Sequence, residues 1–252
     1  MSRRLGQHFL RDKKVLRTII RGLDPAPGEK IIEIGPGHGQ LTQALLATGA
    51  EIIALERDAD LVLWLGQRFP GLDVRIGDAL RLLPAVAPSN GGYKIAGNIP
   101  YYITGRLLRI LGRLRPLPQS IVLLVQKEVA LRAVAQPPHM NRLAAAVQLW
   151  SEPEILALVP PESFAPPPEV DSAVIRLIPH SDQSGPPSAE RILARLFAQP
   201  RKTVLNNLLP KGSLAAKTSL IRRLKAAGIN PADRPQDLSL ADIQNIAALE
   251  YN

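Results

Sequence analysis

Four apolar segments in the first hundred residues are each followed by residues that could bind a ligand. The first leads into the glycine-rich stretch 35–39 (Gly-Pro-Gly-His-Gly), the second ends at Glu56, and Asp78 and Asn98 follow the third and fourth. Glycines at a strand end let the backbone turn tightly and approach a ligand without a Cβ clash. A carboxylate about 20 residues beyond such a loop can accept hydrogen bonds from both hydroxyls of a ribose. The series predicts a nucleoside site, in which Asp78 would accept from an adenine amino group.

The spacing within the glycine-rich stretch narrows the choice of ligand. A dinucleotide fingerprint, G-x-G-x-x-G, would place its third glycine at position 40, where the sequence has Gln40. The spacing present, E-x-G-x-G-x-G over residues 33–39, resembles motif I of the class I methyltransferases, which bind S-adenosylmethionine. Alone, Asp78 would more often be a helix-capping carboxylate. Ligand-binding residue types at three successive strand ends instead favour S-adenosylmethionine as the cofactor.

The stretch GNIPYY, residues 97–102, ends the fourth segment with an amide, a proline and two aromatic side chains. It resembles the N/D-P-P-Y/F motif of methyltransferases that modify exocyclic amino groups. An aryl amine is a poor nucleophile because its lone pair is delocalised into the ring. The Asn98 side-chain oxygen and a backbone carbonyl at Ile99 or Pro100 could accept from the N6 hydrogens of adenine and stabilise the charge that develops on nitrogen. Pro100 would fix the backbone, and an extruded base would stack on Tyr101.

The elements that would position these residues alternate along the first two thirds of the chain. Strand-like runs occupy residues 30–34, 51–55, 73–76, 93–96 and 120–126, and helical spacing occurs at 40–47, 58–69 and 104–114. This alternation predicts a parallel sheet covered on both faces by helices. Two further strand candidates, 155–159 and 173–178, are separated by a proline-rich loop. The predicted fold class is therefore α/β, with a Rossmann-like class I methyltransferase domain.

A polar, proline-rich segment at residues 179–188 is the best linker candidate in the chain. The sequence after it has helical character to its end. We therefore expect two domains. The first, at residues 1–180, would be the catalytic domain that binds S-adenosylmethionine, and the second, at residues 181–252, would be a small all-α domain that binds RNA.

The charge of the chain favours a polyanionic partner. Lys and Arg total 31 against 22 Asp and Glu, which gives a net charge of +9. Residues 1–21 hold seven basic residues and one acid, residues 191–234 hold ten and one, and Arg106, Arg109 and Arg113 share one helix face. Any one of these groups would more often be a solvated face. Three groups together predict a surface that follows the phosphates of a nucleic acid.

Other features exclude whole classes of protein. The chain has no cysteine, which rules out disulfides, thiolate metal sites and thiol catalysis. His38, His139 and His180 lack the spacing of metal ligands, so we expect no metal site. No apolar run is long enough to span a bilayer, and the basic start is not followed by the apolar core of a signal peptide. We expect a cytoplasmic protein that does not associate with membranes.

Four further stretches make the resemblance specific to one family. They are GQHFL at 6–10, QKEVA at 126–130, FAPPPEVDSAV at 164–174, and RKT followed by NNL at 201–208. They are similar to motifs of the ribosomal RNA adenine dimethyltransferases of the KsgA type, and the resemblance extends from residue 6 to about residue 247. It implies transfer of methyl groups from S-adenosylmethionine to N6 of two adjacent adenosines in the 3′-terminal hairpin of small-subunit (16S) rRNA. The product would be N6,N6-dimethyladenosine, with a role in ribosome biogenesis.

The resemblance also implies roles for individual residues. The cofactor-binding residues would be His8, Leu10, Gly35, Gly37, Glu56, Asp78 and Asn98. The target base would contact Asn98, Pro100, Tyr101 and Phe164, with both aromatic rings as stacking partners. His8 stands where asparagine is commoner in the family, and its imidazole can make the same polar contact to the cofactor carboxylate. The implied partner is rRNA within a precursor of the small (30S) subunit, and we expect the protein to act as a monomer.

Three other functions fit parts of the sequence. A resistance methyltransferase acting on large-subunit rRNA would share the fold, but PPPEVDSAV and RKT with NNL favour the small-subunit type. A non-catalytic RNA-binding or assembly protein would have lost Asn98 or Glu56, and both are present. A nicotinamide dehydrogenase is disfavoured by Gln40 and by the lack of a paired acid and base.

Overall fold

A computed structural model describes residues 8–181, 188–209 and 214–249 of the chain. Several residues singled out in the sequence lie outside the described part. These are Gly6 and Gln7 of the GQHFL stretch, Arg3, Arg4 and Lys211 of the basic groups, and residues 182–187 of the predicted linker.

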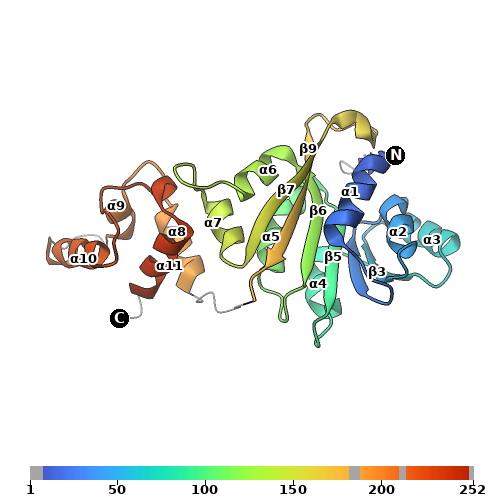
Figure 1. Cartoon of the computed structure of the whole chain (residues 1–252), viewed down its shortest axis with the longest axis horizontal. Coiled ribbons are helices and arrows are strands. Elements are labelled where there is room, and N and C mark those ends of the chain that lie inside the picture. The colour runs from blue at the N-terminus through green and yellow to red at the C-terminus, as the bar shows by residue number, and fades with distance from the viewer. Residues whose placement is uncertain (1–7, 182–187, 210–213, 250–252) are drawn as a thin grey trace. The chain divides into compact units, whose positions relative to one another are not determined.

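The chain divides into two compact units, each with its own apolar core (Figure 1). The sheet unit comprises residues 1–131 and 151–179, and the helical unit comprises residues 132–150 and 180–252. The sequence predicted a single boundary after residue 180. Residues 132–150 nevertheless belong with the C-terminal helices, because Met140, Ala144 and Ala145 are buried in the same apolar cluster as Ile192 and Ile246. The helical unit is therefore discontinuous in sequence.

The sheet unit is built on seven hydrogen-bonded strands. They are β2 (Lys30–Ile34), β3 (Glu51–Glu56), β4 (Asp73–Ile76), β5 (Tyr93–Asn98), β6 (Ser120–Gln126), β7 (Ser151–Val159) and β9 (Ser172–Pro179), in the order β4-β3-β2-β5-β6-β9-β7. The first five are parallel, as the alternating pattern predicted. β9 runs antiparallel to β6 and to β7, because the chain returns from β7 through a loop and not through a crossover helix.

The strand order reverses between β2 and β5, and this reversal determines where a ligand can bind. From β2 the chain moves outward through α2 (Gln40–Leu46), β3 and α3 (Ala59–Arg68) to β4. It then returns through α4 (Ala79–Val86) to β5 and continues through η1 (Tyr101–Ile103) and α5 (Thr104–Leu111) to β6. Right-handed crossovers place the two pairs of helices on opposite faces. In such sheets, ligands bind outside the carboxyl ends of the strands at the reversal.

The N-terminal segment is attached to the sheet unit by a second, two-stranded sheet. β1 (Phe9–Leu10) pairs antiparallel with β8 (Phe164–Ala165), which follows η2 (Pro161–Ser163). The backbone N–H of Arg11 donates to the Ser163 carbonyl at 2.8 Å. α1 (Lys13–Leu23) follows directly, and its buried face, which includes Ile19, shares the main apolar cluster with α2 and the sheet. This packing holds β1 beside the carboxyl ends of β2 and β5.

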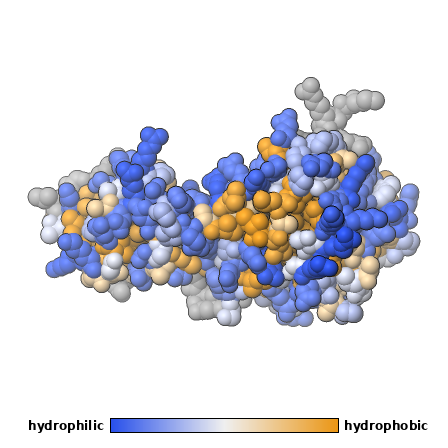
Figure 2. Space-filling view, turned by 45° about the horizontal axis from the view of Figure 1, so that its top comes forward, coloured by the Kyte–Doolittle hydropathy of each residue, from blue (hydrophilic) through white to orange (hydrophobic). Residues whose placement is uncertain are grey.

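The helical unit contains α7 (Arg142–Gln148), α8 (Ser188–Leu196), α9 (Val204–Leu208), α10 (Leu214–Ala226), η3 (Pro235–Asp237) and α11 (Leu240–Leu249). α6 (Lys127–Ala133) joins it to the sheet unit. Hydrophilic side chains cover most of the face shown in Figure 2, and a broad apolar area interrupts them on the sheet unit. Within the described residues, no helix has both the length and the apolar composition needed to cross a membrane.

Candidate functional site

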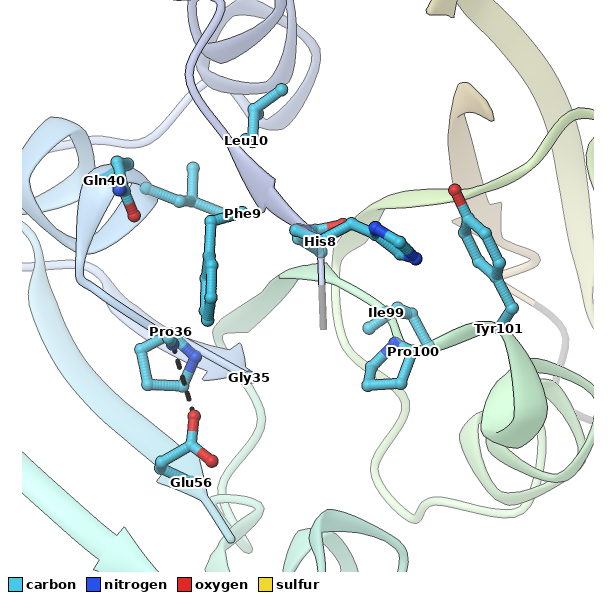
Figure 3. A pocket seen from close by; sticks show the side chains of 13 residues that line it. His8, Phe9, Leu10, Gly35, Pro36, Gln40, Glu56, Ile99, Pro100 and Tyr101 are labelled. Carbon is cyan, nitrogen blue, oxygen red and sulfur yellow. Dashed lines mark hydrogen bonds between the residues drawn. The ribbon is translucent and has the colours of Figure 1, made fainter. Parts of the chain in front are cut away.

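A pocket opens at the carboxyl ends of β2 and β5, where the strand order reverses (Figure 3). It is lined by His8, Phe9, Leu10, Gly35, Pro36, Gly37, Gln40, Leu41, Glu56, Asn98, Ile99, Pro100 and Tyr101. Eight of these were singled out in the sequence: His8, Leu10, Gly35, Gly37, Glu56, Asn98, Pro100 and Tyr101. Residues that are up to 93 positions apart (101 − 8) therefore meet around one space.

The loop after β2 needs glycine for two separate reasons. Gly35 and Gly37 have φ angles of 68° and 57°, in the left-handed region that residues with a Cβ rarely adopt. A Cβ on Gly37 would also lie 3.0 Å from two carbons of the Phe9 ring. Figure 3 shows this ring pointing from β1 toward the loop. The glycines thus let the loop turn and let β1 lie close to it.

Glu56 ends β3 and fixes the glycine loop through its carboxylate. Its Oε2 accepts from the backbone N–H of Gly37 at 3.2 Å, and its Oε1 accepts from the backbone N–H groups of Arg57 and Asp58 at 2.7 and 2.9 Å. The residue is 6% exposed, yet it lines the pocket. A carboxylate oxygen can accept roughly two hydrogen bonds, so Oε2 retains capacity for a donor on a bound ligand.

A second carboxyl group, Glu33, lies in β2 two residues before the glycine loop and is 1% exposed. Among the described residues, both of its oxygens and the Thr42 hydroxyl are without a hydrogen-bond partner of normal geometry. Burial raises the pKa of Glu33 to about 7; the nearby Thr42 hydroxyl offsets part of the rise, and the charge of Glu56 adds to it. Much of Glu33 is therefore neutral at neutral pH.

Asn98 ends β5, and its side chain is oriented by His8, the residue before β1. Its Nδ2 donates to the backbone carbonyl of His8 at 2.8 Å. With the donor end of the amide occupied in this way, the acceptor Oδ1 remains for a ligand. Gly97 allows β5 to reach this position, since a Cβ there would lie 2.6 Å from the Ile34 carbonyl oxygen of β2.

Tyr101 begins η1 and is held at its hydroxyl end. The hydroxyl shares a hydrogen bond of 2.7 Å with the Ser172 Oγ at the start of β9. The His8 ring is stacked near the tyrosine ring, with a centroid distance of 6.1 Å and an interplanar angle of 26°. The His8 Nδ1–H in turn donates to the Pro166 carbonyl at 2.9 Å. Burial raises the pKa of the Tyr101 hydroxyl, and the bond to Ser172 offsets part of that rise.

Two residues singled out in the sequence lie away from the pocket lining. Asp78 caps α4, where its Oδ1 accepts from the Leu80 backbone N–H at 2.9 Å. This is the helix-capping role that the sequence suggested as the alternative to cofactor binding. Phe164 is 4% exposed, because it pairs with Leu10 across the two-stranded sheet and packs into the main apolar cluster. The Phe164 ring thus supports β1 from inside, and we do not retain it as a stacking surface for a base.

Sequence reasoning missed Phe9 and Ser172. Phe9 lies in the GQHFL stretch, but nothing in the sequence placed its ring on Gly37. Ser172 lies in the VDSAV stretch, 71 positions from Tyr101. The GNIPYY and VDSAV stretches had both been singled out by their resemblance to known motifs. That resemblance did not show that Tyr101 and Ser172 are in contact.

The whole described site lies within a chain that matches one family model almost throughout. The model for "Ribosomal RNA adenine dimethylase" matches residues 1–249. The chain belongs to this family.

Individual members agree with the assignment. A ribosomal RNA small subunit methyltransferase A from Dehalococcoides mccartyi is 39% identical over 246 residues, which cover 94% of this chain and 84% of the relative. A crystal structure of a dimethyladenosine transferase from Plasmodium falciparum has a TM-score of 0.86 at 26% identity, covering 97% of this chain and 98% of the other. The 23S rRNA methyltransferase ErmE shares the fold, with a TM-score of 0.75 at 23% identity over 95% and 98% of the two chains. The family and the fold class predicted from the motifs are confirmed.

Proposed function

We propose that this adenine dimethylase transfers methyl groups from S-adenosylmethionine to N6 of two adjacent adenosines in the 3′-terminal hairpin of small-subunit rRNA. The orientation of Asn98 is the main structural support: its donor end is bound to His8, and its acceptor end remains for an amino group. The family and the small-subunit relatives agree with this reaction. Its product is N6,N6-dimethyladenosine, formed during assembly of the small subunit.

The pocket fits S-adenosylmethionine by the chemistry of its lining. Gly35 and Gly37 give a backbone surface without side chains, and Glu56 supplies a carboxylate oxygen for the ribose hydroxyls. On the opposite side lie Leu10 of β1 and the polar groups of His8, the residue before β1. Asp78 lies two residues beyond Ile76, which pairs with Glu56. Its Oδ1 caps α4, so the adenine amino group would meet its other carboxylate oxygen. When bound, the cofactor supplies an electrophilic methyl group.

The target amino group would be held by two acceptors at the end of β5. One is the Asn98 Oδ1. The Pro100 carbonyl already accepts from the Ile103 N–H at 3.1 Å, so the second acceptor is assigned to the Ile99 carbonyl. The Ile99 N–H is itself fixed on Leu124 at 3.0 Å. Two fixed acceptors favour a pyramidal nitrogen and stabilise its developing positive charge. The Tyr101 ring provides the stacking surface for the extruded base.

Exposed basic side chains offer contacts for the RNA backbone on both units. In the sheet unit they are Arg11, Lys13, Lys14, Arg17 and Arg21 around α1, and Arg106 and Arg109 on α5. Arg113 was expected on the same helix face, but it lies in the turn after α5, which ends at Leu111. In the helical unit they include Arg201, Lys202, Lys217, Arg222 and Lys225. Such a spread suits a folded RNA within a precursor of the small subunit better than a short single strand. We further propose a monomer that acts in the cytoplasm.

The test uses precursor small-subunit particles that lack the modification, purified protein and S-adenosylmethionine with a labelled methyl group. Mass spectrometry of the digested rRNA should find N6,N6-dimethyladenosine at two adjacent positions in the 3′-terminal hairpin. Large-subunit particles provide the comparison, since methylation there would favour the resistance type of enzyme. Labelling of neither particle, with a properly folded protein, would overturn the proposed function.

A further inference from the structure

The Ser172 hydroxyl is placed to control the orientation of the Tyr101 ring. Ser172 is 0% exposed, and its backbone pairs with Gln126 of β6 on one side and Val159 of β7 on the other. Its Oγ lies 2.7 Å from the Tyr101 hydroxyl. The serine is thus held in place within the sheet. Tyr101, in contrast, begins the short 3-10 helix η1, which follows β5.

The position of Ser172 is itself fixed by the residue before it. The Lys127 N–H donates to the Asp171 carbonyl at 3.0 Å, and the Lys127 Nζ contacts the Asp171 Oδ2 at 2.9 Å. These contacts join the QKEVA stretch to the VDSAV stretch at the end of the sheet next to the pocket. The two stretches therefore hold the start of β9 where the Tyr101 hydroxyl can reach it.

If its hydroxyl had no hydrogen-bond partner, the Tyr101 side chain would be free to rotate about its first side-chain torsion. The stacked His8 ring limits one side, and the hydrogen bond to Ser172 fixes the far end. The ordinary pKa of a tyrosine hydroxyl already lies well above neutral pH, and burial raises it further for Tyr101. The hydroxyl is therefore protonated at neutral pH and can keep its hydrogen bond to Ser172. The ring is thereby presented to the pocket in one orientation.

We propose that Ser172 is a positioning residue for methyl transfer, which holds the Tyr101 ring in the plane on which the target adenine stacks. This inference rests on the proposed function, and it gives the VDSAV stretch a role in placing the substrate base. Ser172 does not touch the base, the cofactor or the reacting nitrogen. Its effect passes through the tyrosine hydroxyl.

A double-mutant cycle tests the inference. Ser172→Ala and Tyr101→Phe each remove one side of the same hydrogen bond, so each should lower the single-turnover rate at saturating RNA by about 3- to 10-fold. The double variant should be no slower than the slower single variant, because the bond can be lost once. Affinity for the demethylated cofactor should stay within about twofold of the parent. Additive losses would overturn the inference, because they would mean that Ser172 acts through the fold of β9.

Two further variants keep the result interpretable. Ser120→Ala is the matched control. Ser120 is also buried in the sheet, but it begins β6, whereas Ser172 pairs with the last residue of that strand. The Ser120→Ala variant should transfer methyl groups at the parent rate. Ser172→Cys replaces the hydroxyl with a slightly larger and more weakly hydrogen-bonding thiol, so its rate should lie between those of the parent and Ser172→Ala. A Ser172→Cys rate equal to that of the parent, together with slow Tyr101→Phe, would also count against the inference.

The outcome separates this inference from the proposed function. If the parent protein fails to modify small-subunit rRNA, the proposed function is wrong. If the parent modifies it and the cycle is additive, the proposed function stands and the role of Ser172 is wrong. Unfolding curves for each variant exclude loss of folded protein as the cause of a slower rate.

Discussion

The side-chain amide of Asn98 donates to the backbone carbonyl of His8 at 2.8 Å, so a residue at the end of β5 is oriented by the residue that precedes β1. An amide has two chemically different ends, and this bond decides which of them a substrate meets. The acceptor oxygen therefore remains for the amino group that is to be methylated. The GNIPYY and GQHFL stretches therefore form a single functional arrangement, although they are 90 positions apart.

Asn98→Ala removes a preorganised acceptor at a transition state that carries positive charge. The single-turnover rate at saturating RNA should fall by on the order of 10²–10³-fold, with most RNA affinity retained. Asn90→Ala, an exposed asparagine in the loop before β5, is the matched control and should keep the parent rate. Equal rates for Asn98→Ala and the parent would show that the amide has no role in the chemical step.

Glu56→Ala removes the acceptor proposed for the ribose and also releases the N–H of Gly37. Calorimetric affinity for S-adenosylmethionine, or for its demethylated product, should weaken by about 10- to 100-fold, which corresponds to roughly 1.5–3 kcal/mol. Glu51→Ala provides the control, because Glu51 is an exposed glutamate at the start of the same strand. Unchanged binding by Glu56→Ala, or binding of NADH by the parent protein, would contradict the cofactor assignment.

Charge removal on α5 should weaken RNA binding in a manner that depends on salt. Arg106 and Arg109 are exposed on the helix that follows the GNIPYY stretch. Replacing both with alanine should lower affinity and reduce the slope of log affinity against log salt by about 1 for each lost phosphate contact. Arg75→Ala, on the edge strand β4 and ion-paired with Asp73, should change neither quantity much. A binding curve for the parent that is flat in salt would exclude a phosphate-contacting surface.

Local pattern predicted the parallel core well and the packing around the pocket less well. The runs at Lys30–Ile34 and Asp73–Ile76 coincide with β2 and β4. β2 was predictable because a parallel strand inside the sheet is mostly buried and apolar, with sharp ends. β4 is a partly exposed edge strand, and its position in the alternation of strands and helices identified it. The two-residue strands β1 and β8 are too short to give any periodicity. Their pairing buries Phe164, which the sequence had suggested for stacking. A motif assigns a residue to a site, but long-range packing decides which way its side chain points.

Glu33 supplies a prediction about stability that no motif would suggest. In the unfolded chain, this carboxyl group ionises in its ordinary range near 4.5, whereas in the folded protein burial raises its pKa to about 7. Between these values the folded state binds more protons than the unfolded state. The contribution of Glu33 to the free energy of unfolding therefore falls as the pH rises from about 4.5 to about 7, by roughly 3 kcal/mol in total.

Glu33→Gln keeps the size and the buried polar group but removes the titration. The difference in free energy of unfolding between Glu33→Gln and the parent should therefore shift in favour of the variant between pH 5 and pH 8, as measured by denaturant unfolding at each pH. Glu51→Gln, at an exposed position on the neighbouring strand, is measured at the same pH values as the control. A constant difference for Glu33→Gln would mean that Glu33 ionises equally easily in both states. Burial would then not control the protonation of Glu33, and a neutral acid next to the glycine loop at neutral pH would be excluded.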